Sequence, residues 1–220
     1  RLPATVPPYR GERYDRHYTL NDHVQADVIR TLLAIWRATG DKECLAAARR
    51  GGEFLILAQL PEPQPAWAQQ YNFDMEPAWA RAFEPPAVCS AESVGAIRVL
   101  MELYAVTGDE RFLSPIPAAI QWLERSAIGS NRWARLYELR TNRPIYGDRD
   151  GRIHYSLAEL SEERRTGYGW EGDFGISKLI AQWRAGGPRR SEAVSSSPQP
   201  PPRRDRGARA AAIAAIEAQD

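Results

Sequence analysis

The residues Ile29-Arg30-Thr31-Leu32, followed by Gly40-Asp41, decide the fold because they return 68 residues later as Ile97-Arg98-Val99-Leu100 and Gly108-Asp109. In the first copy, apolar residues recur at helical spacing up to Gly40, and Asp41 can cap a second helix that ends near Ala58. Repeated helical hairpins bury their inner faces against each other. The repeat therefore predicts a mainly α protein, built as an α/α toroid of helical hairpins.

The repeat continues beyond the second helix of each hairpin. Trp67-Ala68-Gln69-Gln70-Tyr71 corresponds to Trp133-Ala134-Arg135-Leu136-Tyr137 at an offset of 66 residues. Each unit is thus a hairpin followed by a short strand with the pattern W-A-x-x-Y. In a stack of such units the loops after the second helices emerge at one end, so we expect short β-strands and converging polar residues in the loops of an active site.

Composition divides the 220 residues into three parts and restricts the partners. Residues 1–20 are rich in proline and predict an extended lead-in, residues 21–183 carry the repeat, and residues 184–220 are rich in Pro, Arg and Ala, as disordered tails are. Residues 1–183 hold 22 Lys and Arg against 24 Asp and Glu, a net charge of 22 − 24 = −2, so this body is not a general polyanion binder, and we expect no nucleic-acid partner. No run of about 18 apolar residues exists, so the sequence predicts no membrane span.

Arginines placed beside carboxylates are the strongest chemical signal in the predicted loops. The sequence has no phosphate-binding loop, no dinucleotide fingerprint, no zinc motif and no serine-hydrolase motif. Arg81, Arg135 and Arg149 each offer a planar fork that matches a carboxylate. Three such forks at one end of the molecule suit a uronic-acid polymer. The alternative is that these charges pair with nearby Asp and Glu as solvated ion pairs.

Several stretches, in order along about residues 19–175, make this sequence similar to the pectic acid lyase family, the pectate lyases with an α/α-toroid fold. They are Trp67-Ala68-Gln69-Gln70-Tyr71, Ala80-Arg81-Ala82-Phe83-Glu84-Pro85, the run from Trp133-Ala134-Arg135 to Asp148-Arg149-Asp150, and Glu163-Arg164-Arg165-x-Gly167-Tyr168.

The resemblance implies calcium-dependent β-elimination of polygalacturonate. By it, Arg81 corresponds to the catalytic arginine that acts as base, and Arg135 and Arg149 bind substrate carboxylates. Trp67 and Tyr137, in the same motifs, are expected to contact the substrate as well.

The predicted metal site is the part of this sequence that departs most from the family pattern. The family has an acidic stretch at a helix start that supplies a ligand for calcium (Ca²⁺). Here it reads Asn21-Asp22-His23, so we expect Asn21 and Asp22 to be the metal ligands. The family also has helices ahead of the matched region, and we expect a truncated member.

The sequence thus predicts a pectate lyase that acts as a monomer and is secreted or periplasmic, as its resemblance implies. Two alternatives stay open. One is a non-catalytic relative that binds pectate without turning it over. The other is a helical-repeat scaffold for a protein partner, which an exposed apolar concave face would favour.

Overall fold

A computed structural model describes residues 1–190 of the chain. Its helices form two hairpins and two further helices, and their bounds are α1 Val24–Thr39, α2 Lys42–Ala58, α3 Ser90–Thr107, α4 Ile116–Arg125, α5 Glu162–Gly167 and α6 Ile176–Arg184. Single 3-10 turns stand at η1 Tyr14–Arg16, η2 Asn21–His23, η3 Glu110–Leu113 and η4 Leu157–Glu159. Residues 191–220, most of the predicted tail, lie outside the described part.

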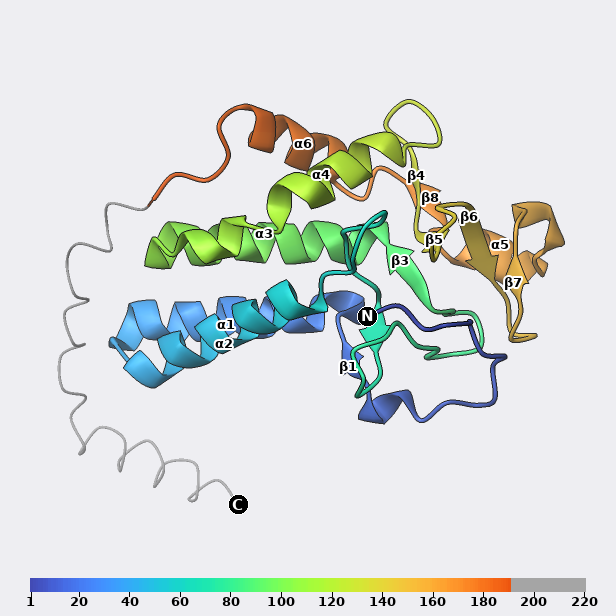
Figure 1. Ribbon diagram of the computed structural model, residues 1–220, viewed down its shortest axis with the longest axis horizontal. Helices are drawn as coiled ribbons and strands as arrows, with labels where there is room; N and C mark the ends of the chain where they lie inside the picture. The colour runs from blue at the N-terminus through green and yellow to red at the C-terminus, as the bar shows by residue number, and fades with distance from the viewer. Residues whose placement is uncertain (191–220) are drawn as a thin grey trace, which may run out of the picture.

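The strands are short and gather at one end of the helices (Figure 1). They are β1 Tyr18–Thr19, β2 Gln70–Tyr71, β3 Ala87–Cys89, β4 Trp133–Ala134, β5 Leu136–Glu138, β6 Pro144–Gly147, β7 Ile153–His154 and β8 Glu171–Gly172. In residues 1–190 they form three antiparallel sheets: β1-β2, β3-β5-β6-β7 and β4-β8.

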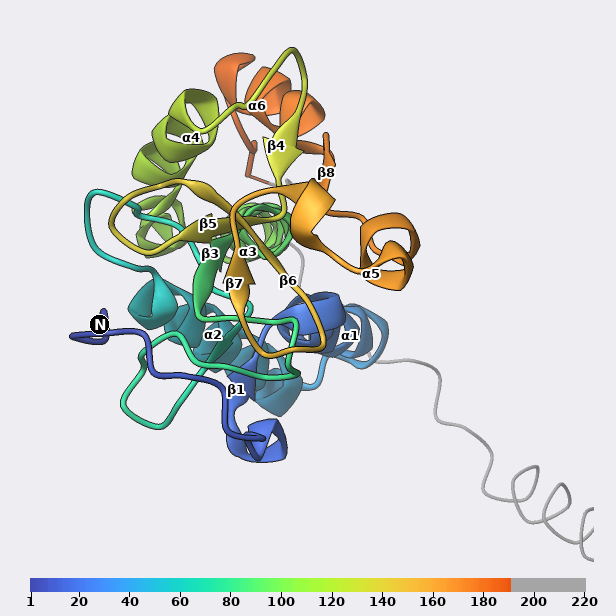
Figure 2. The same ribbon diagram turned by 90° about the vertical axis from the view of Figure 1, so that its right-hand side faces the viewer.

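The prediction of an α/α toroid was wrong. Helices α1 and α2 pack on α3, and α3 packs on α4 and α6. The helices lie in successive layers with α3 in the middle, and within residues 1–190 they do not close into a ring (Figure 2). Two hairpins and the short helices α5 and α6 supply too few inner helices to surround an axis, and small antiparallel sheets cover one end.

The two hairpins nonetheless share the same turn. Helices α1 and α3 end at Gly40 and Gly108, which adopt the left-handed backbone with φ of 72° and 68°. Asp41 and Asp109 then cap the next helical segment by accepting hydrogen bonds from its first backbone N–H groups. The repeat seen in the sequence is therefore a repeat of local structure.

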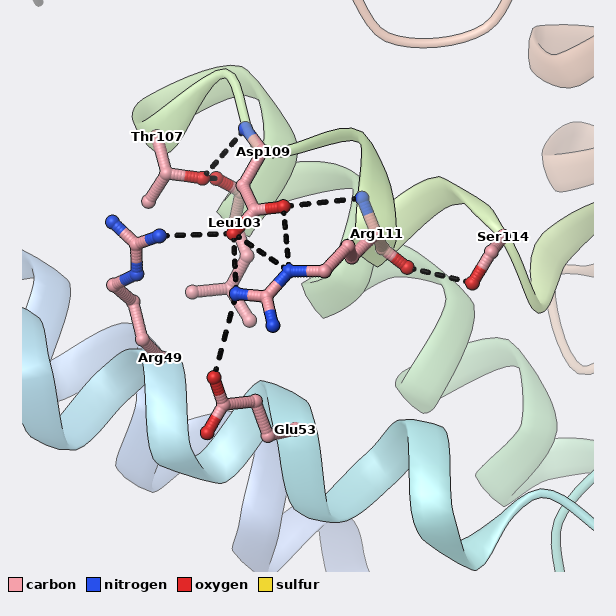
Figure 3. A network of polar contacts seen from close by, with 7 residues as sticks. All are labelled: Arg49, Glu53, Leu103, Thr107, Asp109, Arg111 and Ser114. Carbon is pink, nitrogen blue, oxygen red and sulfur yellow. Dashed lines mark hydrogen bonds and ion pairs between the residues drawn. The ribbon is translucent and has the colours of Figure 1, made fainter.

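At this turn an ion-pair cluster ties the first hairpin to the second (Figure 3). Arg49 of α2 donates to Asp109 at 2.9 Å, and Arg111 donates to both oxygens of Asp109 at 3.1 and 2.8 Å. Arg111 also lies 3.5 Å from Glu53 of α2. The hydrogen bonds from Arg111 hold the pKa of Asp109 well below its usual range, at about 2.

The tryptophan of each W-A-x-x-Y strand anchors that strand to its own hairpin. The Trp67 indole N–H donates to the carbonyl of Leu55 at 2.7 Å, and the Trp133 indole N–H donates to the carbonyl of Leu123 at 2.7 Å. Both indoles are buried in the core. The strands after the hairpins, and the loops that follow them, are thus fixed at the same end of the molecule.

The lead-in follows the loops at this end. The Trp79 indole donates to the carbonyl of Pro7 at 2.7 Å, and Tyr9 packs on Trp79 with ring centroids 5.4 Å apart. Arg140 donates to the carbonyl of Pro3. Within residues 1–190 no helix is long and apolar enough to cross a membrane.

Candidate functional site

Two arginine-bearing loops meet at the sheet β3-β5-β6-β7. The first loop carries Arg81 and leads into β3, and the second begins directly after β6 with Asp148 and Arg149. Gly147, the last residue of β6, lies against the backbone of Phe83, where a Cβ would overlap the Phe83 carbonyl. This close approach, possible only for glycine, puts the two loops side by side.

Arg81 is oriented by a buried carboxylate. Its Nε donates to Glu84 Oε2 at 2.9 Å and its Nη2 donates to Glu84 Oε1 at 2.5 Å. The Glu84 side chain is only 1% exposed, whereas that of Arg81 is 44% exposed. Gln69 and Asn21 donate to the same Oε1 at 2.7 and 3.4 Å. Glu84 therefore fixes one edge of the guanidinium in a side chain that remains partly exposed.

Arg149 forms a second bidentate pair, with Glu163 at the start of α5. Its Nε and Nη2 donate to Glu163 Oε2 and Oε1 at 2.7 and 2.9 Å. Arg164 also donates to Glu163 Oε1. These two guanidiniums hold the pKa of Glu163 well below its usual range, at about 2. The carboxylate is therefore charged throughout the neutral range.

A buried carboxylate holds the Arg149 turn against α5. Asp148 accepts the backbone N–H of Arg149 at 2.7 Å, and it accepts the hydroxyl of Ser161 at 2.9 Å and the Ser161 backbone N–H. Ser161 is the N-cap of α5. Asp148 thus places Arg149 opposite the first turn of α5.

Aromatic rings collect the arginines into one cluster. Three guanidinium carbons surround the Phe83 ring, with Arg164 at 4.3 Å, Arg81 at 4.6 Å and Arg149 at 6.0 Å from its centroid. Phe83 packs edge-on against Tyr168, with centroids 5.7 Å apart. We call these residues, with Arg135, the arginine–aromatic cluster; a guanidinium over an aromatic face is favourable.

Arg135 is the link between this cluster and a neighbouring groove. Its guanidinium lies 4.9 Å from the Tyr168 centroid and 5.1 Å from the Phe174 centroid, and its Nε donates to the carbonyl of Gly169 at 2.7 Å. The structure therefore brings together all three arginines that the sequence predicted for the site.

The groove has a volume of about 490 Å³ and runs between α1 and α3. It is lined by Asp22, His23, Arg30, Ala91, Glu92, Val94, Gly95, Arg98, Arg135 and Phe174. Burial raises the pKa of Glu92 to about 7, against the opposing effect of Arg135. The groove thus has acidic groups at the η2 end and guanidiniums on its walls.

The predicted calcium ligands do not form a calcium site by themselves. Asp22 lines the groove, but the Asn21 amide faces Glu84 in the other loop. Calcium takes six to eight oxygen ligands. In residues 1–190, no three Asp, Glu, His or Cys side chains gather in a way that could hold a metal ion. Of the two predicted ligands, Asp22 lines the groove and Asn21 does not.

The two aromatic residues predicted to contact substrate lie elsewhere. Trp67 and Tyr137 are 0% and 1% exposed, and both belong to the core. Each is held by hydrogen bonds to backbone atoms of its own repeat. Both side chains are enclosed by the core in this structure, and their contact with a substrate stays a prediction.

Sequence reasoning missed Phe83, Tyr168 and Glu163 as parts of the site. All three occur in the motifs quoted above, but no spacing rule indicates that Phe83 and Tyr168 meet. The alternative that the arginines pair with nearby Asp and Glu describes Arg81 and Arg149 here, which pair with Glu84 and Glu163.

A comparison with protein families decides where the chain belongs. The pectic acid lyase model matches residues 3–132 and 126–180. The chain belongs to the pectic acid lyase family. The comparison with curated protein sequences found no match to this chain.

Solved structures agree with the family. A family 10 polysaccharide lyase from Cellvibrio cellulosa is similar to this chain with a TM-score of 0.67 and 26% identity, over 84% of this chain and 68% of that one. A mutant of a family 10 lyase from the same organism, in complex with trigalacturonic acid, gives a TM-score of 0.68 and 26% identity, over 84% and 69%.

Proposed function

We propose that this chain is a pectate lyase that cleaves polygalacturonate by β-elimination, with Arg81 as the catalytic arginine. The observation that carries the proposal is the convergence of Arg81, Arg135 and Arg149 on Phe83 and Tyr168, beside a polar groove. Such guanidinium forks match the carboxylates that a polygalacturonate chain repeats. The complex of a related lyase with trigalacturonic acid supports this substrate class.

The reaction removes the proton on C5 of a galacturonate. The C5–H bond breaks, negative charge develops on the adjacent carboxylate, and the C4–O bond then breaks to leave a C4=C5 double bond. The proton passes to the base, and the departing oxygen takes a proton from solvent. Guanidiniums placed at the carboxylate stabilise the charge as it develops.

Some neighbours of Arg81 favour the neutral form that a base needs, and others oppose it. Arg149 and Arg164 lie around the same Phe83 ring, and neighbouring positive charges favour a neutral guanidine. The bidentate pair with Glu84 favours the charged form. We propose that Arg81 meets the C5 proton with its solvent-facing side, either directly or by orienting a hydroxide ion.

Arg135 and Arg149 are the proposed carboxylate-binding residues. Arg135 stands between the cluster and the groove, and Arg149 is 65% exposed at the rim. A polygalacturonate chain that lies across Arg149 and Arg81 would reach Arg135 and the groove. The three positions would then contact successive parts of one polymer.

Calcium is the proposed cofactor, with Asp22 as its ligand from this chain. A bound calcium ion would neutralise the substrate carboxylate. Because Asp22 and Glu92 are the two carboxylates that line the groove, substrate oxygens and water would have to complete the coordination of the ion. We also propose that residues 21–183 form the lyase domain and that the protein is a monomer. It would act outside the cytoplasm, secreted or in the periplasm, where pectate occurs.

Lyase activity on polygalacturonate tests the proposal through the absorbance of the unsaturated uronate product. We expect Arg81→Ala to lose activity, and Arg135→Ala and Arg149→Ala to raise KM several-fold. Arg165→Ala, an exposed arginine on α5 outside the cluster, is the control and should keep the activity. Equal activity in the Arg81→Ala and Arg165→Ala variants would refute the role of Arg81.

A binding-only relative is the second candidate, and the small number of metal ligands favours it. It predicts that folded protein binds trigalacturonate without forming product, with or without calcium.

A further inference from the structure

Arg149 and Arg81 each form an ion pair with a glutamate of the same chain, but the two carboxylates differ in their exposure to solvent. Glu84 is 1% exposed and has Arg81, Gln69 and Asn21 as donors. Glu163 is 51% exposed. Glu84 is thus a fixed part of the fold, whereas Glu163 lies where a solvent-borne carboxylate could replace it.

The pair between Arg149 and Glu163 has the geometry of a ligand contact. Two parallel N–H donors of one guanidinium meet the two oxygens of one carboxylate at 2.7 and 2.9 Å. A galacturonate carboxylate that binds the same Nε–Nη2 edge of Arg149 must displace Glu163, because one edge of a guanidinium holds one carboxylate.

Glu163 would keep a partner after such an exchange. Arg164 donates to Glu163 Oε1, and the Arg164 side chain is only 11% exposed, fixed over the Phe83 ring. The Nε of Arg164 is buried and has no hydrogen-bond partner within residues 1–190. Because Arg164 can take over the released carboxylate, breaking the Arg149 pair does not leave Glu163 without a counter-charge.

The element that carries Glu163 can adjust. Helix α5 is six residues long and has no buried residue, and it is held at its start by Ser161 and Asp148. A small movement of the Glu163 side chain toward Arg164 would free Arg149 without disturbing the core.

Resting on the proposed function, we propose that Glu163 is an affinity-determining residue of this site. It occupies the Arg149 fork in the unliganded protein and is exchanged for a galacturonate carboxylate when the polymer binds. Exposed ion pairs contribute little, so the exchange is easy and lowers substrate affinity only several-fold.

The test is a double-mutant cycle on the affinity for trigalacturonate, measured by isothermal titration calorimetry in the Arg81→Ala background to suppress turnover. We expect Glu163→Gln to bind about two- to fivefold more tightly than its parent, because Arg149 is then free. When Arg149→Ala is also present, Glu163→Gln should bind trigalacturonate no more tightly than Glu162→Gln does.

The matched control is Glu162→Gln, which removes the same charge from the same helix without touching Arg149. An equal gain in affinity in both glutamine variants would show that the effect comes from the change in net charge alone, and it would overturn the inference. Weaker binding of Glu163→Gln would overturn it too, by showing that Glu163 only positions Arg149. If the wild-type protein as well as all variants neither binds nor cleaves trigalacturonate, the proposed function itself fails, and the inference falls with it.

Discussion

The guanidinium of Arg81 and the carboxylate of Glu84 form a bidentate pair in which the acid is buried and the base is half exposed. Replacing Glu84 by Gln should therefore release Arg81 from its orientation. We expect kcat to fall at least about tenfold and the free energy of unfolding to fall by about 1–3 kcal/mol, as for other buried hydrogen-bond partners. Chemical denaturation and initial rates check both, and an unchanged kcat would contradict the orienting role.

Gly147 should tolerate no side chain. A Cβ there overlaps the backbone carbonyl of Phe83, so Gly147→Ala must push β6 away from the Arg81 loop. We expect a loss of about 1–3 kcal/mol in unfolding free energy and a loss of activity. Gly129→Ala is the matched control, since its nearest neighbour lies at 3.8 Å. If the two variants behave alike, the close approach does not matter for the site.

Both repeats should lose stability when the hydroxyl of the strand tyrosine is removed. The backbone N–H of Ala68 donates to the Tyr71 hydroxyl at 2.7 Å, and that of Ala134 donates to the Tyr137 hydroxyl at 3.0 Å. Tyr71→Phe and Tyr137→Phe each leave a buried N–H without its partner, at a cost of about 1–3 kcal/mol.

Thermal or chemical unfolding of both variants measures this cost. Tyr137 also donates to the carbonyl of Ser126 at 2.5 Å, so Tyr137→Phe should be the more destabilising. A negligible effect in either variant would contradict an anchoring role for that tyrosine.

The ion-pair cluster at Asp109 should make stability depend on pH (Figure 3). The pKa of Asp109 is depressed to about 2, below the ordinary value of about 3.9 in an unfolded chain. Its stabilising contribution is therefore complete above pH 4 and is lost as the pH falls toward 2.

Asp109→Asn should cost about 1 kcal/mol at pH 7, with a difference from wild type that shrinks between pH 4 and 2. Asp41→Asn is the control, because Asp41 caps the equivalent position and contacts no arginine within residues 1–190. Urea titrations at several pH values measure both. The same pH dependence in Asp41→Asn would assign the effect to the cap instead of the arginines.

Local rules were enough to predict the first hairpin. Gly40 ends α1 and Asp41 caps α2, which runs from Lys42 to Ala58 as its apolar spacing indicates. The layered arrangement was beyond such rules, because both an open stack and a closed ring bury the inner faces of repeated hairpins. The number of helices and their contacts decide between them.

Half of the candidate site depends on contacts that sequence spacing does not encode. Arg81, Arg135 and Arg149 were predicted from the chemistry of arginine, and the structure places them in one cluster. Glu163 meets Arg149 only because β6, β7 and α5 fold back on each other. Trp67 and Tyr137 were placed at the substrate because a conspicuous aromatic motif does not reveal whether its rings face a ligand or the core.

The central claim is that this chain cleaves polygalacturonate by β-elimination. Its most direct test follows the absorbance of unsaturated uronates when folded protein acts on polygalacturonate, first with calcium and then with a chelator. The account predicts a rise with calcium that the chelator abolishes. No rise in either condition, from protein that circular dichroism shows to be helical, would contradict the account.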